Sequence, residues 1–251
     1  IFLFVPPLPA WTLAGENVVV QPTDETTGQL LATLTFDTVT QAGETTLTTS
    51  AGGPTVPSSF ALGNPPLYYN LSTTAIFSGF ITVCVDFSAV RFPDTSGLRL
   101  LHYEGGTWQD VTIGGGAVGT TICGRVTSLS PFVVVKDIAP PTISSVSASP
   151  AKLWPPNKKM VPVNVTAVAS DNCGGVVSCK ITSVSSNEPP NSNAVTTGDA
   201  VITGNLTLNL RADRNGNGSG RIYTITVQCT DVSGNSSFKT TTVLVPHDQG
   251  K

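Results

Sequence analysis

Charged residues are scarce in this chain of 251 residues, of which 12% are Asp, Glu, Lys or Arg, and the formal net charge is −3. Proteins that bind nucleic acids normally carry a clustered basic face, so this composition argues against a nucleic-acid partner. The sequence also lacks an apolar run of the roughly 18 residues that a membrane-spanning helix needs. We therefore expect neither nucleic-acid binding nor a membrane span.

The residues that usually carry enzyme chemistry are few. The chain has two histidines, His102 and His247, and no GxSxG nucleophile elbow. The acidic residues are scattered and lie mostly in turn-like stretches, where Asp bonds the backbone, and no carboxylate pair is typical of a glycosidase. We expect a protein that is not an enzyme, with no catalytic residue and no cofactor, and a secreted hydrolase is the least supported alternative.

One stretch resembles part of a calcium-binding loop. The segment DRNGNG, from Asp213 to Gly218, matches the opening of an EF-hand loop, but the twelfth position is Thr224 rather than the bidentate glutamate that such a loop requires. A loop between two strands is therefore the better interpretation, and we expect no metal site. The alternative is a calcium site that uses Asp171, Asp213 or Asp231.

The pattern of apolar residues predicts an all-β protein. No stretch shows the long 3.6-residue periodicity of an amphipathic helix, and short alternating runs are separated by clusters of Gly, Pro, Asn and Asp. The chain is long enough for two β-sandwich domains, and the Pro-rich segment DIAPPT at 137–142 is the best boundary. We expect an apolar N-terminal strand in residues 1–14, a first domain in residues 15–138 and a second in residues 139–251.

Strands are expected wherever alternation is clear. In the first domain these are residues 17–21, 29–38, 79–87, 98–103, 107–111, 120–127 and 132–136. In the second domain they are residues 142–147, 161–170, 176–185, 205–211, 221–230 and 237–245.

Five cysteines are present, and none forms a CxxC pair with zinc-site spacing. Several lie inside strand-like runs of a chain with little charge, which is typical of disulfides and hence of an oxidising compartment. We expect the protein to be secreted, extracellular or at the cell surface.

The alternation of side chains along a strand indicates where two of these cysteines point. In VVSCKI, Cys179 shares the apolar face with Val177 and Ile181, and in YTITVQC, Cys229 shares it with Val227. We expect a Cys179–Cys229 disulfide that joins the two sheets through the core, as in immunoglobulin-type sandwiches.

The other cysteines lie in different surroundings. Cys84 in ITVCVDF and Cys123 in TTICGRV fall on the polar face of their strands, which predicts a cross-strand disulfide on a solvated face. Cys173, in SDNCGG, is left over. It is a buried thiol, or it bridges to Cys179 and leaves Cys229 unpaired, or it bonds to another chain.

Two sets of motifs resemble known modules. LYYNLSTTAIFSGFITVCVDF, LRLLHYEGGTWQDVT and TICGRVTSLSPFVVV resemble a β-sandwich module of large bacterial surface and secreted proteins. LWPPNKKMVPVNVTAVASDNCGG, CKITSVSSNEP and YTITVQCTDVSGNS resemble HYR-like, immunoglobulin-like repeats of bacterial extracellular proteins. The resemblance implies two tandem immunoglobulin-like β-sandwich domains outside the cytoplasm. It leaves the function open, because such modules serve as spacers, adhesins and polymer subunits.

The first 13 residues, IFLFVPPLPAWTL, lie outside both resemblances and carry three prolines but no charge. Prolines suit an edge strand or an extended segment, and the alternative is the remnant of a signal peptide. An apolar strand can complete a sheet in its own domain or, by donor-strand complementation, in a neighbouring copy. The expected donor-strand residues are Ile1, Phe2, Leu3, Phe4, Val5, Leu8 and Trp11.

Charge is divided unevenly along the chain. Residues 1–140 contain ten acidic and four basic side chains, a balance of −6, and residues 141–251 contain six and nine, a balance of +3. Opposite charges suit head-to-tail association of identical subunits. We therefore expect a structural subunit of an extracellular filament or pilus-like fibre, a homopolymer that is assembled by the N-terminal strand and stabilised by disulfides.

The alternative function is that of an adhesin or carbohydrate-binding module of a larger secreted or surface protein. Exposed aromatic residues would then form a platform for surface glycans, and the candidates are Tyr68, Tyr69, Trp108 and Trp154. Packing in the core is the competing interpretation for each of them, because Tyr and Trp are mostly buried.

Overall fold

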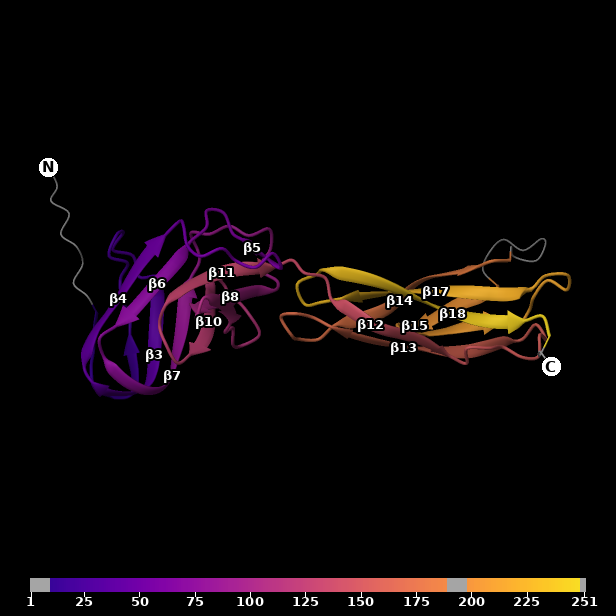
Figure 1. Ribbon diagram of the computed structural model, residues 1–251, viewed down its shortest axis with the longest axis horizontal. Coiled ribbons are helices and arrows are strands. Elements are labelled where there is room, and N and C mark those ends of the chain that lie inside the picture. The colour runs from indigo at the N-terminus through magenta and orange to yellow at the C-terminus, as the bar shows by residue number, and fades with distance from the viewer. Residues whose placement is uncertain (1–9, 189–197, 249–251) are drawn as a thin grey trace. The chain divides into compact units, whose positions relative to one another are not determined.

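A computed structural model describes residues 10–188 and 198–248 (Figure 1). Within these ranges every regular element is a β-strand, and the named strands all pair antiparallel. The all-β prediction is confirmed. The same residues contain no helix long and apolar enough to cross a membrane. The chain divides into two compact units, Ile1–Ile138 and Ala139–Lys251.

The first unit contains the strands β1 to β11. They are β1 (Ala10–Thr12), β2 (Gly15–Val20), β3 (Ala32–Gln41), β4 (Gly43–Ser50), β5 (Phe60–Leu62), β6 (Tyr68–Thr73), β7 (Ile76–Asp86), β8 (Leu98–Glu104), β9 (Thr107–Asp110), β10 (Thr121–Val126) and β11 (Pro131–Asp137).

These strands form two sheets that enclose one core. One sheet has the order β1-β4-β6-β11-β8-β9, with β5 also paired to β11, and the other has the order β10-β7-β3-β2. Alternation sets the inner faces: in β7, Ile81, Val83 and Val85 are buried, and the residues between them face outward. They meet Tyr69 and Phe132 of the facing sheet in a single apolar cluster.

Strand β11 is buried on both of its faces. Phe132 and Val134 belong to the core between the sheets, whereas Val133 and Val135 pack on the opposite face in a second cluster with Tyr68. The connection between β4 and β6 contributes to this second cluster through partly buried apolar side chains. Burial on both faces explains why the sequence PFVVV is continuously apolar rather than alternating.

The second unit contains β12 (Thr142–Ser149), β13 (Met160–Ser170), β14 (Ser178–Ser186), β15 (Ala200–Gly204), β16 (Thr207–Arg211), β17 (Gly220–Thr230) and β18 (Ser236–Pro246). One sheet has the order β12-β13-β16-β15 and the other the order β14-β17-β18. Their inner faces form one core, in which Val163 and Leu208 of the first sheet meet Tyr223, Val227 and Val243 of the second.

Candidate functional site

The first disulfide lies on the outer face of the four-stranded sheet of the first unit. Cys84 of β7 and Cys123 of β10 stand directly opposite each other in the strand register, with their Cα atoms 4.0 Å apart. Both are half-buried. This is the pair and the position expected from the polar phase of these two residues.

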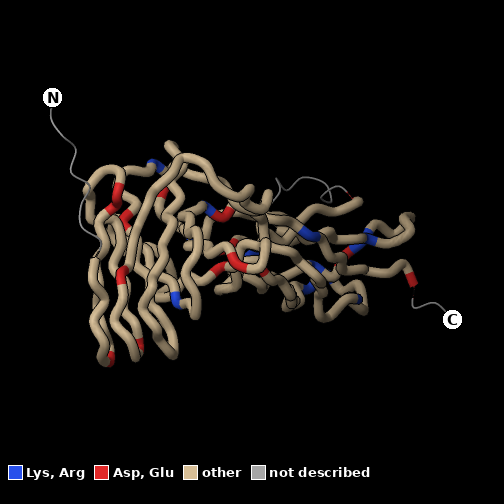
Figure 2. The backbone as a smooth tube through the Cα atoms, turned by 60° about the vertical axis from the view of Figure 1, so that its left-hand side comes forward, with Lys and Arg blue, Asp and Glu red and all other residues tan. Residues whose placement is uncertain are grey.

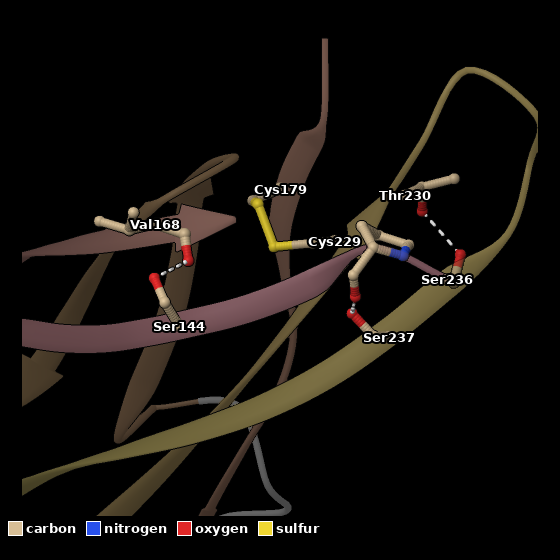
Figure 3. The surroundings of a disulfide bond; sticks show 8 residues. Ser144, Val168, Cys179, Cys229, Thr230, Ser236 and Ser237 are labelled. Carbon is tan, nitrogen blue, oxygen red and sulfur yellow. Dashed lines mark hydrogen bonds between the residues drawn. A yellow bond between two sulfur atoms is a disulfide. The ribbon is translucent and has the colours of Figure 1, made fainter. Parts of the chain in front are cut away.

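The second disulfide joins Cys179 of β14 to Cys229 of β17, with a Cα–Cα distance of 4.1 Å (Figure 3). The prediction of a bridge between the two sheets is wrong, because β14 and β17 are neighbours in the same sheet. Both cysteines have the apolar phase, as expected, but their strands pair in register and place them side by side. Cys173 belongs to neither disulfide, so its alternative bridge to Cys179 is also wrong.

Hydroxyl groups near this disulfide hold the strands together (Figure 3). The hydroxyls of Thr230 in β17 and Ser236 in β18 are 2.7 Å apart, and Ser237 donates to the carbonyl of Pro141 at 2.5 Å. Ser144 of β12 donates to the carbonyl of Val168 in β13 at 3.0 Å. With Cys229 fully buried, the surroundings are those of a structural disulfide.

A Ser–His pair occurs in the first unit, where Ser130 Oγ lies 2.6 Å from His102 Nε2. His102 is buried and stacks on Phe132 with ring centroids 4.5 Å apart. Ser130 also donates to the carbonyl of Tyr103. Because a carbonyl only accepts, the serine proton lies on that bond and His102 Nε2 donates to Ser130. A nucleophilic serine needs the opposite arrangement, with histidine as the acceptor, so the pair is structural.

We expect acid to destabilise the first unit through His102. Burial lowers the pKa of His102 below its ordinary value of 6.5, so the unfolded chain binds the proton first as the pH falls. Stability should therefore fall as the pH drops below about 6.5 and level off below the folded-state pKa. Urea denaturation of the full chain at several pH values should show this slope, and His102→Gln should remove it. His247→Gln, at an exposed position, is the control; a slope that survives His102→Gln would contradict the assignment.

The aromatic candidates for a glycan platform lie in unlike surroundings. Tyr68 and Tyr69 are buried, so core packing is the correct interpretation for both. Trp108 is half-buried, 5.1 Å from the ring of Tyr103, and its Nε1 donates to the carbonyl of Thr55 at 3.1 Å. Trp154 is 44% exposed and is the candidate that presents a ring to solvent.

The described end of the N-terminal segment completes a sheet of its own unit. Strand β1 pairs with the edge of β4, and fully buried Thr12 places its hydroxyl 2.6 Å from that of Thr45. Trp11 lies opposite Glu44 and is 58% exposed, so it is not an anchor in its own sheet. The other expected donor-strand residues lie outside the described residues: Ile1, Phe2, Leu3, Phe4, Val5 and Leu8.

Beyond β1, a turn covers the edge of β4. The amide of Glu25 donates to the carbonyl of Leu47 at 2.9 Å, and the amide of Thr49 donates to Asp24 Oδ1 at 2.8 Å. Burial by itself raises the pKa of Asp24, but hydrogen bonds from Thr27 and Thr49 outweigh it and lower that pKa. The carboxylate therefore holds this turn, and the edge of β4 is closed to another strand.

Among the edge strands of the described sheets, β2 and β15 both expose apolar side chains. Strand β2 pairs with β3 alone, and its Val19 is 60% exposed. Strand β15 pairs with β16 alone, and its Val201 and Ile202 are 43% and 44% exposed. Ile202 stands opposite Leu208, which is 1% exposed. Residues that lie directly opposite each other in a sheet share a face. Ile202 therefore lies on the face that packs against the core, but its side chain is partly exposed to solvent.

The buried Arg221 is a feature that the sequence interpretation missed. Its Nη1 donates to Asp199 Oδ2 at 2.7 Å and contacts the Tyr223 hydroxyl at 3.1 Å, and its Nε donates to Glu188 Oε2 at 3.2 Å. Burial by itself lowers the pKa of the Arg221 guanidinium, but hydrogen bonds with these three partners raise it above its ordinary value. The alternation of side chains along the strand could have indicated that Arg221 is buried, because this residue falls on the same strand face as Tyr223 and Cys229.

The DRNGNG segment lies in the connection between β16 and β17. The prediction of a loop between two strands is confirmed. The amide of Asn217 donates to Asn215 Oδ1 at 3.2 Å, and the amide of Asn215 donates to Glu188 Oε2 at 2.8 Å. Arg214 donates to the carbonyl of Pro246 at 3.0 Å and to that of His247 at 2.6 Å. The segment is thus tied to the end of β18 by an arginine.

No protein-family model, curated protein or solved structure matches this chain. The resemblance to HYR-like repeats therefore stays a prediction.

Proposed function

We propose that this protein is a structural subunit of an extracellular filament, a homopolymer of immunoglobulin-like β-sandwich domains. The observation that carries the proposal is the open edge of β15, where Ile202 has the phase of the core but is 44% exposed. An added strand would pair with the backbone of β15 and cover this side chain. The apolar segment of residues 1–9 from a neighbouring copy is the donor that we assign to it.

Charge supports a head-to-tail order of the copies. The donor belongs to the acidic first unit and the acceptor to the basic second unit, and Figure 2 shows the two kinds of charge distributed in this way. The contact is heterologous, because the two surfaces that meet are different, and such a contact propagates into a filament when it does not close into a ring. The two disulfides support an extracellular setting and brace each unit against unfolding in the polymer.

Deleting residues 1–9 should abolish assembly and leave the fold intact, because β1 begins at Ala10 and keeps its pairing with β4. Burial of Phe2, Phe4 and Leu8 contributes on the order of 5–9 kcal/mol before ordering costs. The critical concentration for assembly should therefore rise by about 1,000-fold or more. Electron microscopy and light scattering of the two proteins measure this, with thermal melting to show that the truncated chain folds.

The acceptor edge has its own test. Ile202→Lys places a charge on the open edge and should block assembly to a similar degree, since an edge lysine disfavours strand addition. Val118→Lys, at a position that is 79% exposed in the first unit, is the matched control and should assemble normally. Val19→Lys tests β2: if that variant fails and Ile202→Lys assembles, β2 is the acceptor. A full-length chain that stays monomeric at high concentration would refute the homopolymer.

A further inference from the structure

The loop between β12 and β13, residues 150–159, presents an unusual group of side chains. Its sequence is PAKLWPPNKK, and Lys152, Lys158 and Lys159 are exposed, as is Trp154 of the same loop. Among the described residues, none of the three ammonium groups has an ion-pair partner. The loop therefore carries three uncompensated positive charges and one solvent-facing indole.

The backbone of this loop is fixed at both ends. At its start, the amide of Leu153 donates to the carbonyl of Leu244 at 2.8 Å, and Leu244 donates back to Ala151 at 3.0 Å. At its end, the amide of Lys158 donates to the carbonyl of Ala212 at 2.9 Å, and Ala212 donates back to Lys159 at 2.8 Å. Little backbone freedom is thus left to lose when a ligand binds, which favours affinity.

Asp199 does not neutralise the lysines, because two arginines already occupy it. Arg211 donates to the carbonyl of Lys158 at 2.9 Å, which places this guanidinium beside the loop. Its carboxylate partner is Asp199, 2.8 Å away, and Asp199 also accepts a hydrogen bond from Arg221. Asp199 is therefore shared between two arginines, and the three lysines, which have no ion pair among the described residues, remain available to an external anion.

We propose that this loop binds an acidic polysaccharide. The apolar face of a pyranose ring stacks on Trp154, and carboxylates of neighbouring uronate residues pair with Lys152, Lys158 and Lys159. A purely electrostatic partner, such as the acidic first unit of another copy, would need the lysines but not the exposed indole. The polysaccharide accounts for both. The loop and β15 are different segments of the chain, and this inference does not depend on the proposed polymerisation.

Three polymers distinguish the contribution of the sugar ring from that of the negative charge. Each is titrated into the full chain, and binding is measured by tryptophan fluorescence and calorimetry. Polygalacturonate carries both the sugar ring and the charge. Its fully methyl-esterified form keeps the ring and lacks the charge, and polyaspartate keeps the charge and lacks the ring. We expect the first to bind most tightly, with an affinity that falls as salt is added.

Variants separate the contributions of the side chains. Trp154→Ala should weaken polygalacturonate binding by about tenfold, and Lys158→Gln and Lys159→Gln by about threefold each. The matched control is Lys180→Gln, an exposed lysine of β14 that should bind as the parent does. Thermal melting verifies that each variant folds. The inference is overturned if polyaspartate competes as well as polygalacturonate, if the esterified polymer binds equally, or if Lys180→Gln weakens binding as much as the loop variants do.

Discussion

Replacing Cys179 and Cys229 together by alanine should lower the free energy of unfolding of the second unit by about 4 kcal/mol from the loss of loop closure alone. The two cysteines are 50 residues apart in the sequence, and without the bridge the unfolded chain regains the freedom of that loop. Cys229 is fully buried, so its truncation also removes packing contacts and adds about 1 kcal/mol. Hydrogen exchange of the full chain measures this, because it reports on each unit separately.

The other disulfide provides a matched control. Cys84 and Cys123 are 39 residues apart, so the entropic loss on replacing both by alanine differs by only about 0.2 kcal/mol. Both side chains lie on the outer face of their sheet, where truncation removes little packing. The second-unit variant should therefore lose more stability than the first-unit variant does. Equal losses would mean that packing around Cys229 contributes nothing, and a loss below about 1 kcal/mol in both would contradict a structural role for the disulfides.

Strands with clear apolar alternation could be predicted from the sequence to within a few residues. Strand β7 was expected at 79–87 and spans Ile76–Asp86, and β17 was expected at 221–230 and spans Gly220–Thr230. In both, a run of apolar residues at alternate positions makes the buried face visible: Ile81, Val83 and Val85 in β7, and Tyr223, Ile225 and Val227 in β17. The all-β class followed from such runs and from the turn residues between them.

Strand β4, with the sequence GETTLTTS, could not be found in this way. Its buried face contains Thr45, whose hydroxyl lies 2.6 Å from that of Thr12 and 2.8 Å from that of Thr73. Hydrogen bonds between threonines on three neighbouring strands provide partners for the buried hydroxyl groups in this part of the sheet. A pattern of hydrophobicity does not report such contacts, because each partner lies about thirty residues away and looks polar on its own.

The candidate sites show the same limit. The phase of Cys179 and Cys229 identified which cysteines face the core, but it could not tell whether the two strands are neighbours in one sheet or face each other across the core. The partners of Arg221 lie 33 and 22 residues away in the sequence. The alternation of apolar residues shows on which face of a strand a residue lies. The residues that this face contacts depend on the order of the strands in the sheets, which alternation does not determine.

Arg221→Met should lower the free energy of unfolding by about 3–5 kcal/mol, because it leaves the buried carboxylate of Glu188 without its cation. The side chain of Arg221 is 1% exposed and that of Glu188 is 10% exposed, so water cannot replace the lost ion pair. Asp199 suffers less, since it keeps Arg211 at 2.8 Å. Arg211→Met is the control: this pair is about 30% exposed on each side, and its loss should cost about 1 kcal/mol or less.

The double variant Arg221→Met/Glu188→Met decides whether the cost comes from the isolated charge. Removing both partners leaves no uncompensated carboxylate, and two apolar side chains fill the space, so part of the lost stability should return. Urea denaturation of the single and double variants gives the coupling energy between the two residues. Recovery of stability means that Arg221 neutralises Glu188 at the end of the β-sandwich. If the double variant is as unstable as the sum of the single ones, the guanidinium instead stabilises the fold through its contacts with Asp199 and the Tyr223 hydroxyl.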